Sequence, residues 1–170
     1  MPGLDAFAVA ALIEEIGTRL ELKGESDFKV RAYYRAAETL RGLEESLANV
    51  IASGQLRELS GIGEALAEKI ATLHQTGTHP TLQRLRDEVP DGLLDLMRVP
   101  GLGPKRIRHL HAELNVKDME SLAEAVGTGR LDGLKGFGEK SAARLREALE
   151  FVRLSDHQLL LPQADTAIEN

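Results

Sequence analysis

The chain has 170 residues, enough for one compact domain or two small ones, and its lack of cysteine excludes disulfides and zinc–thiolate sites. Apolar residues make up 42% of the sequence and aromatic residues only 4%, and no run approaches the roughly 18 apolar residues that a membrane span needs. The N-terminus has no signal-peptide pattern, so we expect a cytoplasmic protein, with a formal net charge of −6.

The charge is unevenly distributed along the chain, which matters because most DNA-binding domains are basic. Residues 1–54 carry 6 basic and 9 acidic side chains, and residues 55–97 carry 4 and 7. Residues 98–154 carry 11 basic and 8 acidic side chains, a net charge of +3, whereas residues 155–170 carry 3 acidic and no basic ones. A surface that binds a polyanion is therefore expected within residues 98–154.

Helical periodicity runs through almost the whole chain, and no segment alternates as a strand would. A first helix, with its apolar face over residues 9–20, is predicted to end at Gly24. A second is capped by Ser26 or Asp27 and ends near Gly42, and a third stops at Gly54. The apolar positions of the third helix are Leu43, Leu47, Val50 and Ile51. Interrupted periodicity between residues 77 and 91 indicates a domain boundary.

A short pattern then occurs three times: an apolar residue, any residue, glycine, an apolar residue, glycine, and the start of an amphipathic helix. The copies are Leu59-Ser60-Gly61-Ile62-Gly63-Glu64, Val99-Pro100-Gly101-Leu102-Gly103-Pro104 and Leu134-Lys135-Gly136-Phe137-Gly138-Glu139. A connector helix is predicted over residues 117–126, between the last two copies. The fold class is therefore all-α: a small helical domain with one helix-hairpin-helix, followed by a tandem helix-hairpin-helix domain.

Glycine, an apolar residue and glycine before a helix suit the binding of a phosphate group. Glycine permits the tight turn, and the apolar residue between the glycines anchors the hairpin to its helices. The first amides of the next helix lack intrahelical partners and favour an anion. Such contacts position a protein on DNA without reading its base sequence. A single copy is more often an ordinary turn, and such hairpins can also be structural or bind protein, but three copies favour backbone binding.

Charge ranks the three hairpins, and the second and third are the more basic. The first has Arg57 and Lys69 among three glutamates, Glu58, Glu64 and Glu68. The second is flanked by Arg98, Lys105, Arg106, Arg108 and His109, and the third by Lys135, Lys140, Arg144 and Arg146. The residues predicted to bind DNA are Gly61, Gly63, Arg98, Gly101, Gly103, Lys105, Arg106, Lys135, Gly136, Gly138 and Lys140.

The order of these parts resembles the N-terminal half of bacterial family X DNA polymerases over about residues 4–154. Residues 26–37 (SDFKVRAYYRAA) are similar to the second helix of that family's small gap-binding domain, and residues 59–70 to its hairpin. Residues 98–110 resemble the fingers hairpin, and residues 134–149 the extra hairpin of the bacterial branch. The resemblance implies a lyase-like gap-binding domain over residues 1–80, a fingers-like tandem domain over 81–154, and a tail over 155–170 similar to the start of the polymerase palm.

The resemblance also implies binding at gapped or nicked DNA in base excision repair, with the small domain on the 5′-phosphate side. Lys29, Tyr33 and Arg57 would form the 5′-phosphate pocket, although the helical spacing of Tyr33 is equally typical of a core residue. A monovalent cation, Na⁺ or K⁺, would be held by backbone carbonyls of the first two hairpins, and no organic cofactor is expected. Those carbonyls belong to Arg57, Leu59 and Ile62 in the first hairpin and to Met97, Val99 and Leu102 in the second.

The family's catalytic palm has no counterpart in the sequence, because its clustered metal-binding aspartates are missing. This chain alone is not expected to polymerise, and a palm in a longer parent protein is an expected partner. Some relatives act as 5′-deoxyribose-phosphate lyases through a lysine that aligns with Lys69. Such a nucleophile has to be a neutral amine, whereas Glu64 and Glu68 share its side of the helix and Ala65 replaces a lysine of competent relatives. A lyase and a protein-interaction scaffold remain the alternatives.

Overall fold

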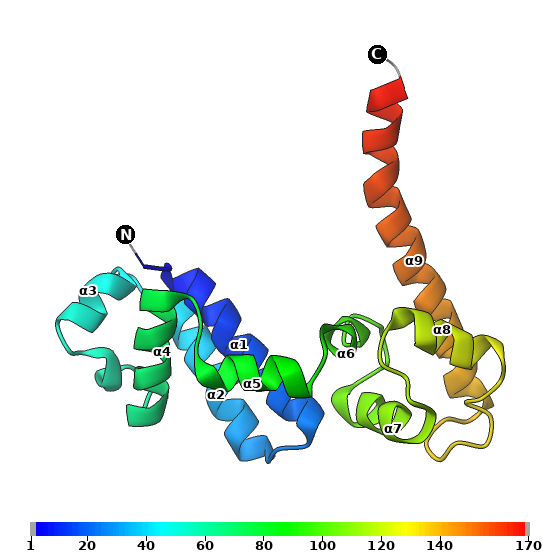
Figure 1. The fold of residues 1–170 in the computed structure, drawn as a ribbon, viewed down its shortest axis with the longest axis horizontal. Helices are drawn as coiled ribbons and strands as arrows, with labels where there is room; N and C mark the ends of the chain where they lie inside the picture. The colour runs from blue at the N-terminus through cyan, green and yellow to red at the C-terminus, as the bar shows by residue number, and fades with distance from the viewer. Residues whose placement is uncertain (1–2, 169–170) are drawn as a thin grey trace. The chain divides into compact units, whose positions relative to one another are not determined.

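The computed structural model describes residues 3–168, with side chains described for residues 3–152 and for Leu154. All regular secondary structure in this range is helical, which confirms the all-α prediction (Figure 1). The chain divides into two compact units at Pro90, and each unit is described by itself. Among the described residues, no helix combines the length and the apolar character required to cross a membrane.

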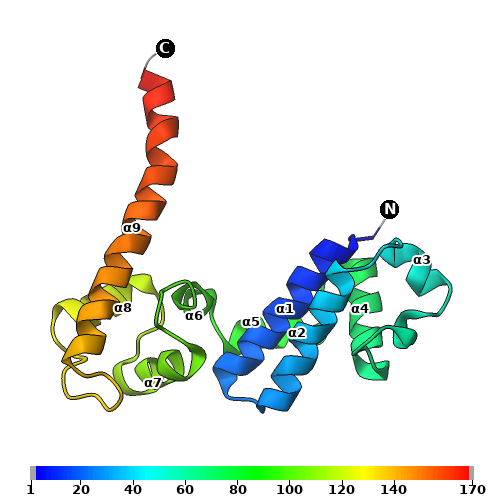
Figure 2. The ribbon, with the colours of Figure 1, turned by 180° about the vertical axis from the view of Figure 1, so that it is seen from behind.

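The first unit is built around two long helices that lie side by side (Figures 1 and 2). Its elements are α1 (Ala6–Lys23), α2 (Asp27–Arg41), α3 (Leu47–Ala52), the 3-10 turn η1 (Leu56–Glu58), α4 (Glu64–Thr76) and α5 (Pro80–Glu88). Asp5 caps α1 by accepting from the Ala8 amide at 2.8 Å, and Gly24 ends that helix with a φ of +93°. Ser26 caps α2, so the predicted ends of both helices are confirmed.

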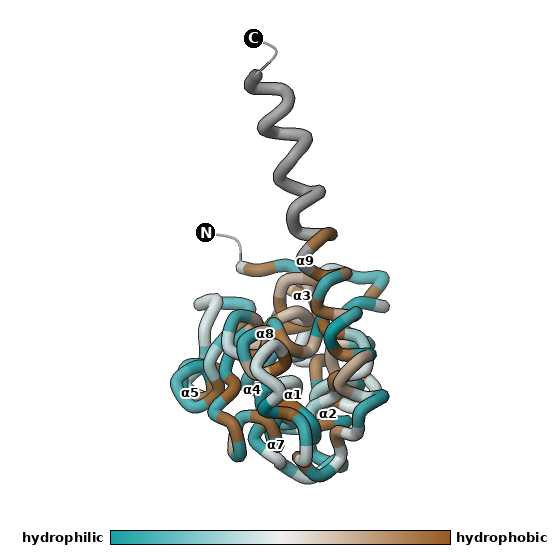
Figure 3. The backbone as a smooth tube through the Cα atoms, turned by 90° about the vertical axis from the view of Figure 1, so that its right-hand side faces the viewer, coloured by the Kyte–Doolittle hydropathy of each residue, from teal (hydrophilic) through white to brown (hydrophobic). Residues whose placement is uncertain are grey.

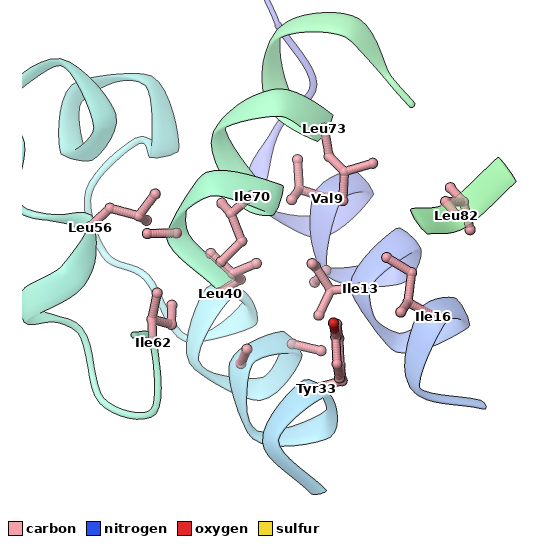
Figure 4. Packing of buried hydrophobic residues seen from close by; sticks show 14 of the residues in the cluster. Val9, Ile13, Ile16, Tyr33, Leu40, Leu56, Ile62, Ile70, Leu73 and Leu82 are labelled. Carbon is pink, nitrogen blue, oxygen red and sulfur yellow. The ribbon is translucent and has the colours of Figure 1, made fainter. Parts of the chain in front are cut away.

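One hydrophobic core joins these helices, and Figure 4 shows part of it. It arises because apolar residues recur at helical spacing on one face of each helix, between polar positions (Figure 3). Fully buried members from the first three long helices include Val9, Ile13, Ile16, Leu40, Ile70 and Leu73. Ile62, from the first hairpin, belongs to the same cluster, so this hairpin is fixed to the body of the unit.

Two predicted boundaries differ in the structure. The third helix begins at Leu47 rather than near Leu43, because the Ser46 side chain accepts from the Asn49 amide at 3.2 Å and starts the helix there. The first unit also continues past residue 80. Proline fits the first position of a helix, and the α5 residues Leu82 and Leu85 are fully buried in the core of the first unit.

A partly buried network of charged residues ties α5 to α1. The Arg19 side chain is only 2% exposed; its Nε donates to Glu15 Oε2 at 2.9 Å, and its guanidinium also donates to the Val89 carbonyl. Arg86 donates to both oxygens of Glu15, from Nε at 2.7 Å and from Nη2 at 2.9 Å. These bonds, chiefly those from Arg86, hold the pKa of Glu15 below its ordinary value.

The second unit contains the other two hairpins. Its elements are α6 (Asp91–Leu96), α7 (Pro104–Leu114), α8 (Met119–Gly127) and α9 (Glu139–Ile168). The helix predicted to connect the hairpins is α8, and Asp118 and Ser121 form a capping box at its start. Asn115 ends α7 with a φ of +56°. Residues 155–168, expected as a separate tail, are part of α9.

Candidate nucleic-acid interface

The three hairpins share one backbone turn, in which the amide of the middle apolar residue donates to the carbonyl three residues earlier. These bonds join Ile62 to Leu59 at 3.2 Å, Leu102 to Val99 at 3.1 Å and Phe137 to Leu134 at 3.0 Å. The third residue of each turn is a glycine with a positive φ, +78° at Gly61, +83° at Gly101 and +90° at Gly136. Residues with a side chain rarely adopt this left-handed backbone conformation, which explains why glycine recurs there.

The middle apolar residue of each hairpin is buried, as the sequence predicts. Ile62 is 3% exposed, and Leu102 and Phe137 are each 4% exposed. Ile62 enters the core of the first unit between α2 and α4 (Figure 4). Phe137 reaches α7 of the preceding hairpin, where its ring stacks on His109 with 6.5 Å between centroids. The third hairpin is therefore packed against the second.

The helices that follow the hairpins start differently from their neighbours. Gly63 and Gly103 are the N-caps of α4 and α7, and no described side chain caps either helix. By contrast, α1, α2, α3, α5 and α8 each have a side-chain acceptor at the N-terminus. A Cβ atom at Gly63, Gly103 or Gly138 would meet nothing within 4 Å. The N-termini of α4 and α7 therefore remain open to an acceptor from outside the chain.

Cationic groups gather where the second and third hairpins meet. The Arg106 guanidinium lies over the Phe137 ring, 5.4 Å from its centroid, and its Nη1 donates to the Gly101 carbonyl at 3.2 Å. A cavity of about 100 Å³ lies beside them, lined by Ser141 and Arg144 among others. Lys105 and Lys140 hold matching places, each the second residue of the helix after its hairpin. Arg98, Lys105, Arg106, Lys135, Lys140 and Arg144 are all exposed.

Two polar atoms at this junction are buried without a hydrogen bond to any described residue: Arg108 Nε and His109 Nε2. Both residues belong to α7, on the turn that faces the third hairpin through the His109–Phe137 stack. A buried donor without a partner is costly in a folded protein.

Of the three residues expected in a 5′-phosphate pocket, Tyr33 is buried, whereas Lys29 and Arg57 are exposed. The Tyr33 ring lies in the core, where it is 7% exposed and its Cβ is 3.1 Å from the Cβ position of Gly17 on α1. Burial raises the pKa of the Tyr33 hydroxyl. Lys29 is half-exposed at the start of α2, 3.9 Å from Glu25, and Arg57 is exposed on η1. The core alternative for Tyr33 is the one that the structure supports.

A basic residue absent from the sequence prediction lies beside the first hairpin. A Cβ atom at Gly61 would approach the stem of Arg35 to 2.7 Å at Cδ and 2.9 Å at Cγ. Thr39, one turn later on α2, donates from Oγ1 to the Ser60 carbonyl at 2.9 Å. The same helix thus presents Tyr33 to α1 and Arg35 to the hairpin. Only tertiary packing brings Arg35 there, so no local sequence signal marks it.

Lys69 is half-buried on α4, and the carboxylate next to it in sequence is engaged by His79. His79 Nε2 lies 3.0 Å from Glu68 Oε2, and its Nδ1 accepts from the Thr81 amide at 3.0 Å, so Nε2 carries the proton and donates. The hydrogen bond from His79 is the main cause of the lowered pKa of Glu68, and the Lys69 charge adds to it. Glu68 is therefore an anion at neutral pH.

The cation predicted for the hairpins has a suitable donor set. Among the described residues, no three His, Cys, Asp or Glu side chains cluster as a metal site would require. Hairpin carbonyls are neutral oxygen donors. The Leu59 and Val99 carbonyls accept the turn bonds of the first and second hairpins, and a carbonyl oxygen keeps a second lone pair. The turns thus offer neutral oxygen donors of the kind that a monovalent cation takes.

Comparison with known proteins agrees with this geometry. Residues 6–79 match the helix-hairpin-helix domain family, and residues 93–150 match the SAM-like helix-hairpin-helix tandem family. The chain is 40% identical over 141 residues to the DNA polymerase/3′-5′ exonuclease PolX of Bacillus subtilis, which covers 83% of this chain. The chain spans about a quarter of that relative, 24% of its length. It is thus built of two helix-hairpin-helix domains and is homologous to a small part of a bacterial family X DNA polymerase.

Proposed function

We propose that this chain binds DNA through its sugar-phosphate backbone, without reading base sequence. One observation carries the proposal: the helices after the first two hairpins begin at a glycine, lack side-chain caps and have open space at that glycine. A phosphate oxygen can approach these N-termini closely and accept from their first amides. Backbone amides cannot reach base edges from such a position, so the contact is independent of sequence.

The second and third hairpins are proposed as the main binding surface. They lie in one unit, packed together through Phe137, and six exposed basic residues surround them. Cations near a phosphate-binding turn add a salt-dependent attraction that a net negative chain otherwise lacks. A monovalent cation on the carbonyls of Met97, Val99 and Leu102, and of Arg57, Leu59 and Ile62, would add positive charge at the same turns.

The DNA class that we propose is a gap or nick with a 5′-phosphate, as arises in base excision repair. Supporting it are the two-unit organisation, with hairpins in both units, and the 40% identity to a DNA polymerase. We propose further that the chain supplies DNA binding to a polymerase of that kind. Its own described residues contribute no cluster of metal-binding carboxylates for nucleotidyl transfer.

Fluorescence anisotropy with three labelled duplexes tests the proposal. One duplex has a one-nucleotide gap, one a nick and one no break; the first two are prepared with and without a 5′-phosphate. We expect the tightest binding to the phosphorylated gap, with affinity that falls as salt rises. Tight binding that is equal for all duplexes would retain backbone binding and overturn the preference for gaps. No binding at low salt would overturn the function and favour the scaffold alternative.

A further inference from the structure

We propose that Arg35, on α2, is a phosphate-binding residue of the first hairpin. The inference rests on the proposed function, because it concerns how this hairpin meets the DNA backbone. From the sequence, the first hairpin is the least basic of the three, because the acidic residues Glu58 and Glu64 follow Arg57. The structure supplies a cation to it from a different helix.

The evidence is a close approach at Gly61. This glycine has a φ of +78°, and the stem of Arg35 occupies the space where its side chain would project. The nearest Arg35 atom is Cδ, at 2.7 Å from the Cβ position, and the guanidinium begins one C–N bond, about 1.45 Å, beyond that atom. The charged group is therefore held at the hairpin turn and not elsewhere along α2.

The position of α2 on the hairpin is fixed by a second contact. Thr39 lies one turn after Arg35 and donates to the Ser60 carbonyl, immediately before Gly61 in the sequence. Ile62, immediately after Gly61, is anchored in the core. Because the turn is anchored on both sides of Gly61, the position of the Arg35 stem beside the turn is fixed. In the other two hairpins, nothing lies within 4 Å of the equivalent positions at Gly101 and Gly136.

Two other basic residues of α2 have acidic partners, which Arg35 lacks among the described side chains. Arg41 is paired with Glu14, and Lys29 lies 3.9 Å from Glu25. Arg35 is exposed and forms no ion pair with any residue whose side chain the structure describes. An exposed guanidinium offers a planar fork of donors that fits phosphate oxygens in pairs. Its stem packs on the turn while its head remains available to a ligand.

The substitution Arg35→Gln tests the inference, because glutamine keeps the three side-chain carbons that pack on Gly61 and removes the charge. Binding of the full chain to a 5′-phosphorylated gapped duplex is measured by anisotropy from 50 to 200 mM salt. We expect several-fold weaker binding at 50 mM and a salt slope that is smaller by about 0.9. Raising the salt concentration from 50 to 200 mM should then weaken binding by the variant about 3.5-fold less than it weakens binding by the parent chain.

Two further variants make the result specific. Arg84→Gln removes one charge from α5, where the side chain is 62% exposed and lies 3.9 Å from Glu88, and should leave the slope unchanged. Arg35→Lys keeps the charge, so it should retain the slope. If the parent chain fails to bind, the proposed function fails. If the parent binds and Arg35→Gln has the same slope as Arg84→Gln, the role of Arg35 alone is overturned. Thermal melting equal to that of the parent separates lost contact from lost fold.

Discussion

Glu15, on α1, joins the last helix of the first unit to its first helix by an ion pair with Arg86. It accepts from Arg19 on its own helix and from Arg86 on α5, and the Glu15 side chain is 20% exposed. The ionised carboxylate makes these charge-assisted bonds, whereas its protonated form loses most of their strength. The stability of the first unit should therefore depend on pH through this residue.

The substitution Glu15→Gln is expected to lower the free energy of unfolding at pH 7 by about 1–2 kcal/mol, after allowance for its partial exposure. The pKa of Glu15 is lowered in the folded chain from 4.5, so its contribution is complete above that pH. It is lost as pH falls through the lower, folded value. The difference between parent and variant should thus shrink below about pH 4.5.

Urea unfolding followed by tyrosine fluorescence measures this in the first unit alone. The chain has 2 tyrosines and no tryptophan, and both tyrosines lie on α2. Glu113→Gln, at an exposed position on α7, serves as the control. Its free energy of unfolding should equal that of the parent at every pH. A difference between Glu15→Gln and the parent that stays constant down to pH 3 would contradict the ion-pair explanation.

Lys69 is predicted not to act as a Schiff-base nucleophile. A Schiff-base nucleophile has to be a neutral amine, whereas the side chain next to Lys69 in sequence, Glu68, is kept ionised by His79. We expect no covalent adduct above background when the chain is treated with borohydride and DNA that bears a 5′-deoxyribose phosphate. An adduct that persists in Lys140→Ala and disappears in Lys69→Ala would establish the lyase instead.

The sequence predicted the shape of the hairpins, where the signal is local, and gave no sign of contacts that depend on tertiary packing. The glycines and the buried residues of the hairpins follow from a pattern six residues long. Tyr33 could not be assigned, because its spacing fits both a core face and an exposed one. Arg35 left no signal, since its partner Gly61 lies 26 residues later and meets it only through the packing of α2 on the hairpin.

At the scale of elements, the two glycines of a hairpin have different tasks. Gly101 has a φ of +83°, so a side chain there is strained even though nothing lies nearby. Gly103 has a φ of −94°, which any residue adopts, and its surroundings are equally open. The turn itself explains the first glycine but not the second. Under the proposed function, close approach of a phosphate would explain the second.

Alanine substitution should separate these tasks. Gly101→Ala is expected to lower the free energy of unfolding by about 1–2 kcal/mol because of the left-handed backbone. Gly103→Ala should change it by less than about 0.5 kcal/mol, yet weaken DNA binding, because its methyl group occupies the path of the phosphate. Circular dichroism in urea and anisotropy on the gapped duplex measure the two effects. Unchanged binding by a folded Gly103→Ala chain would argue against phosphate contact at α7.

The helices were predictable where caps and periodicity agree, as in α1 and α2. The start of α3 was not, because Leu43 continues the apolar spacing and packs on the core without being helical. Nor was α5, since it lies in the segment between residues 77 and 91 where the periodicity is interrupted and begins at Pro80. A proline at the first helical position lacks only an amide that has no helical partner anyway, so the same residue both interrupts one helix and starts another.

On the scale of the whole molecule, the net charge of −6 opposes DNA, and binding has to rely on local contacts. Residues 1–90 carry 10 basic and 14 acidic side chains, and residues 91–170 carry 11 and 13. All 11 basic residues of the second unit lie within residues 98–154. Attraction is therefore confined to a limited surface, and a few contacts should account for most of the salt dependence.

Lys105 and Lys140 offer a test of whether the second and third hairpins both belong to that surface. Each is the second residue of the helix after its hairpin, and the equivalent residue in the first hairpin is Ala65. If both lysines contact phosphate, Lys105→Ala and Lys140→Ala should each reduce the salt slope by about 0.9, and the double variant by about 1.8. The losses should be alike on duplexes of different base sequence, because phosphates carry no sequence information.

Anisotropy titrations on three gapped duplexes of unrelated base sequence measure both features. Lys117→Ala is the matched control, an exposed lysine of the same unit that lies outside both hairpins. A loss confined to Lys105→Ala would mean that the third hairpin packs on the second without touching DNA, and Phe137 would then have a purely structural role. A loss that depends on base sequence would place these lysines at base edges and contradict backbone binding.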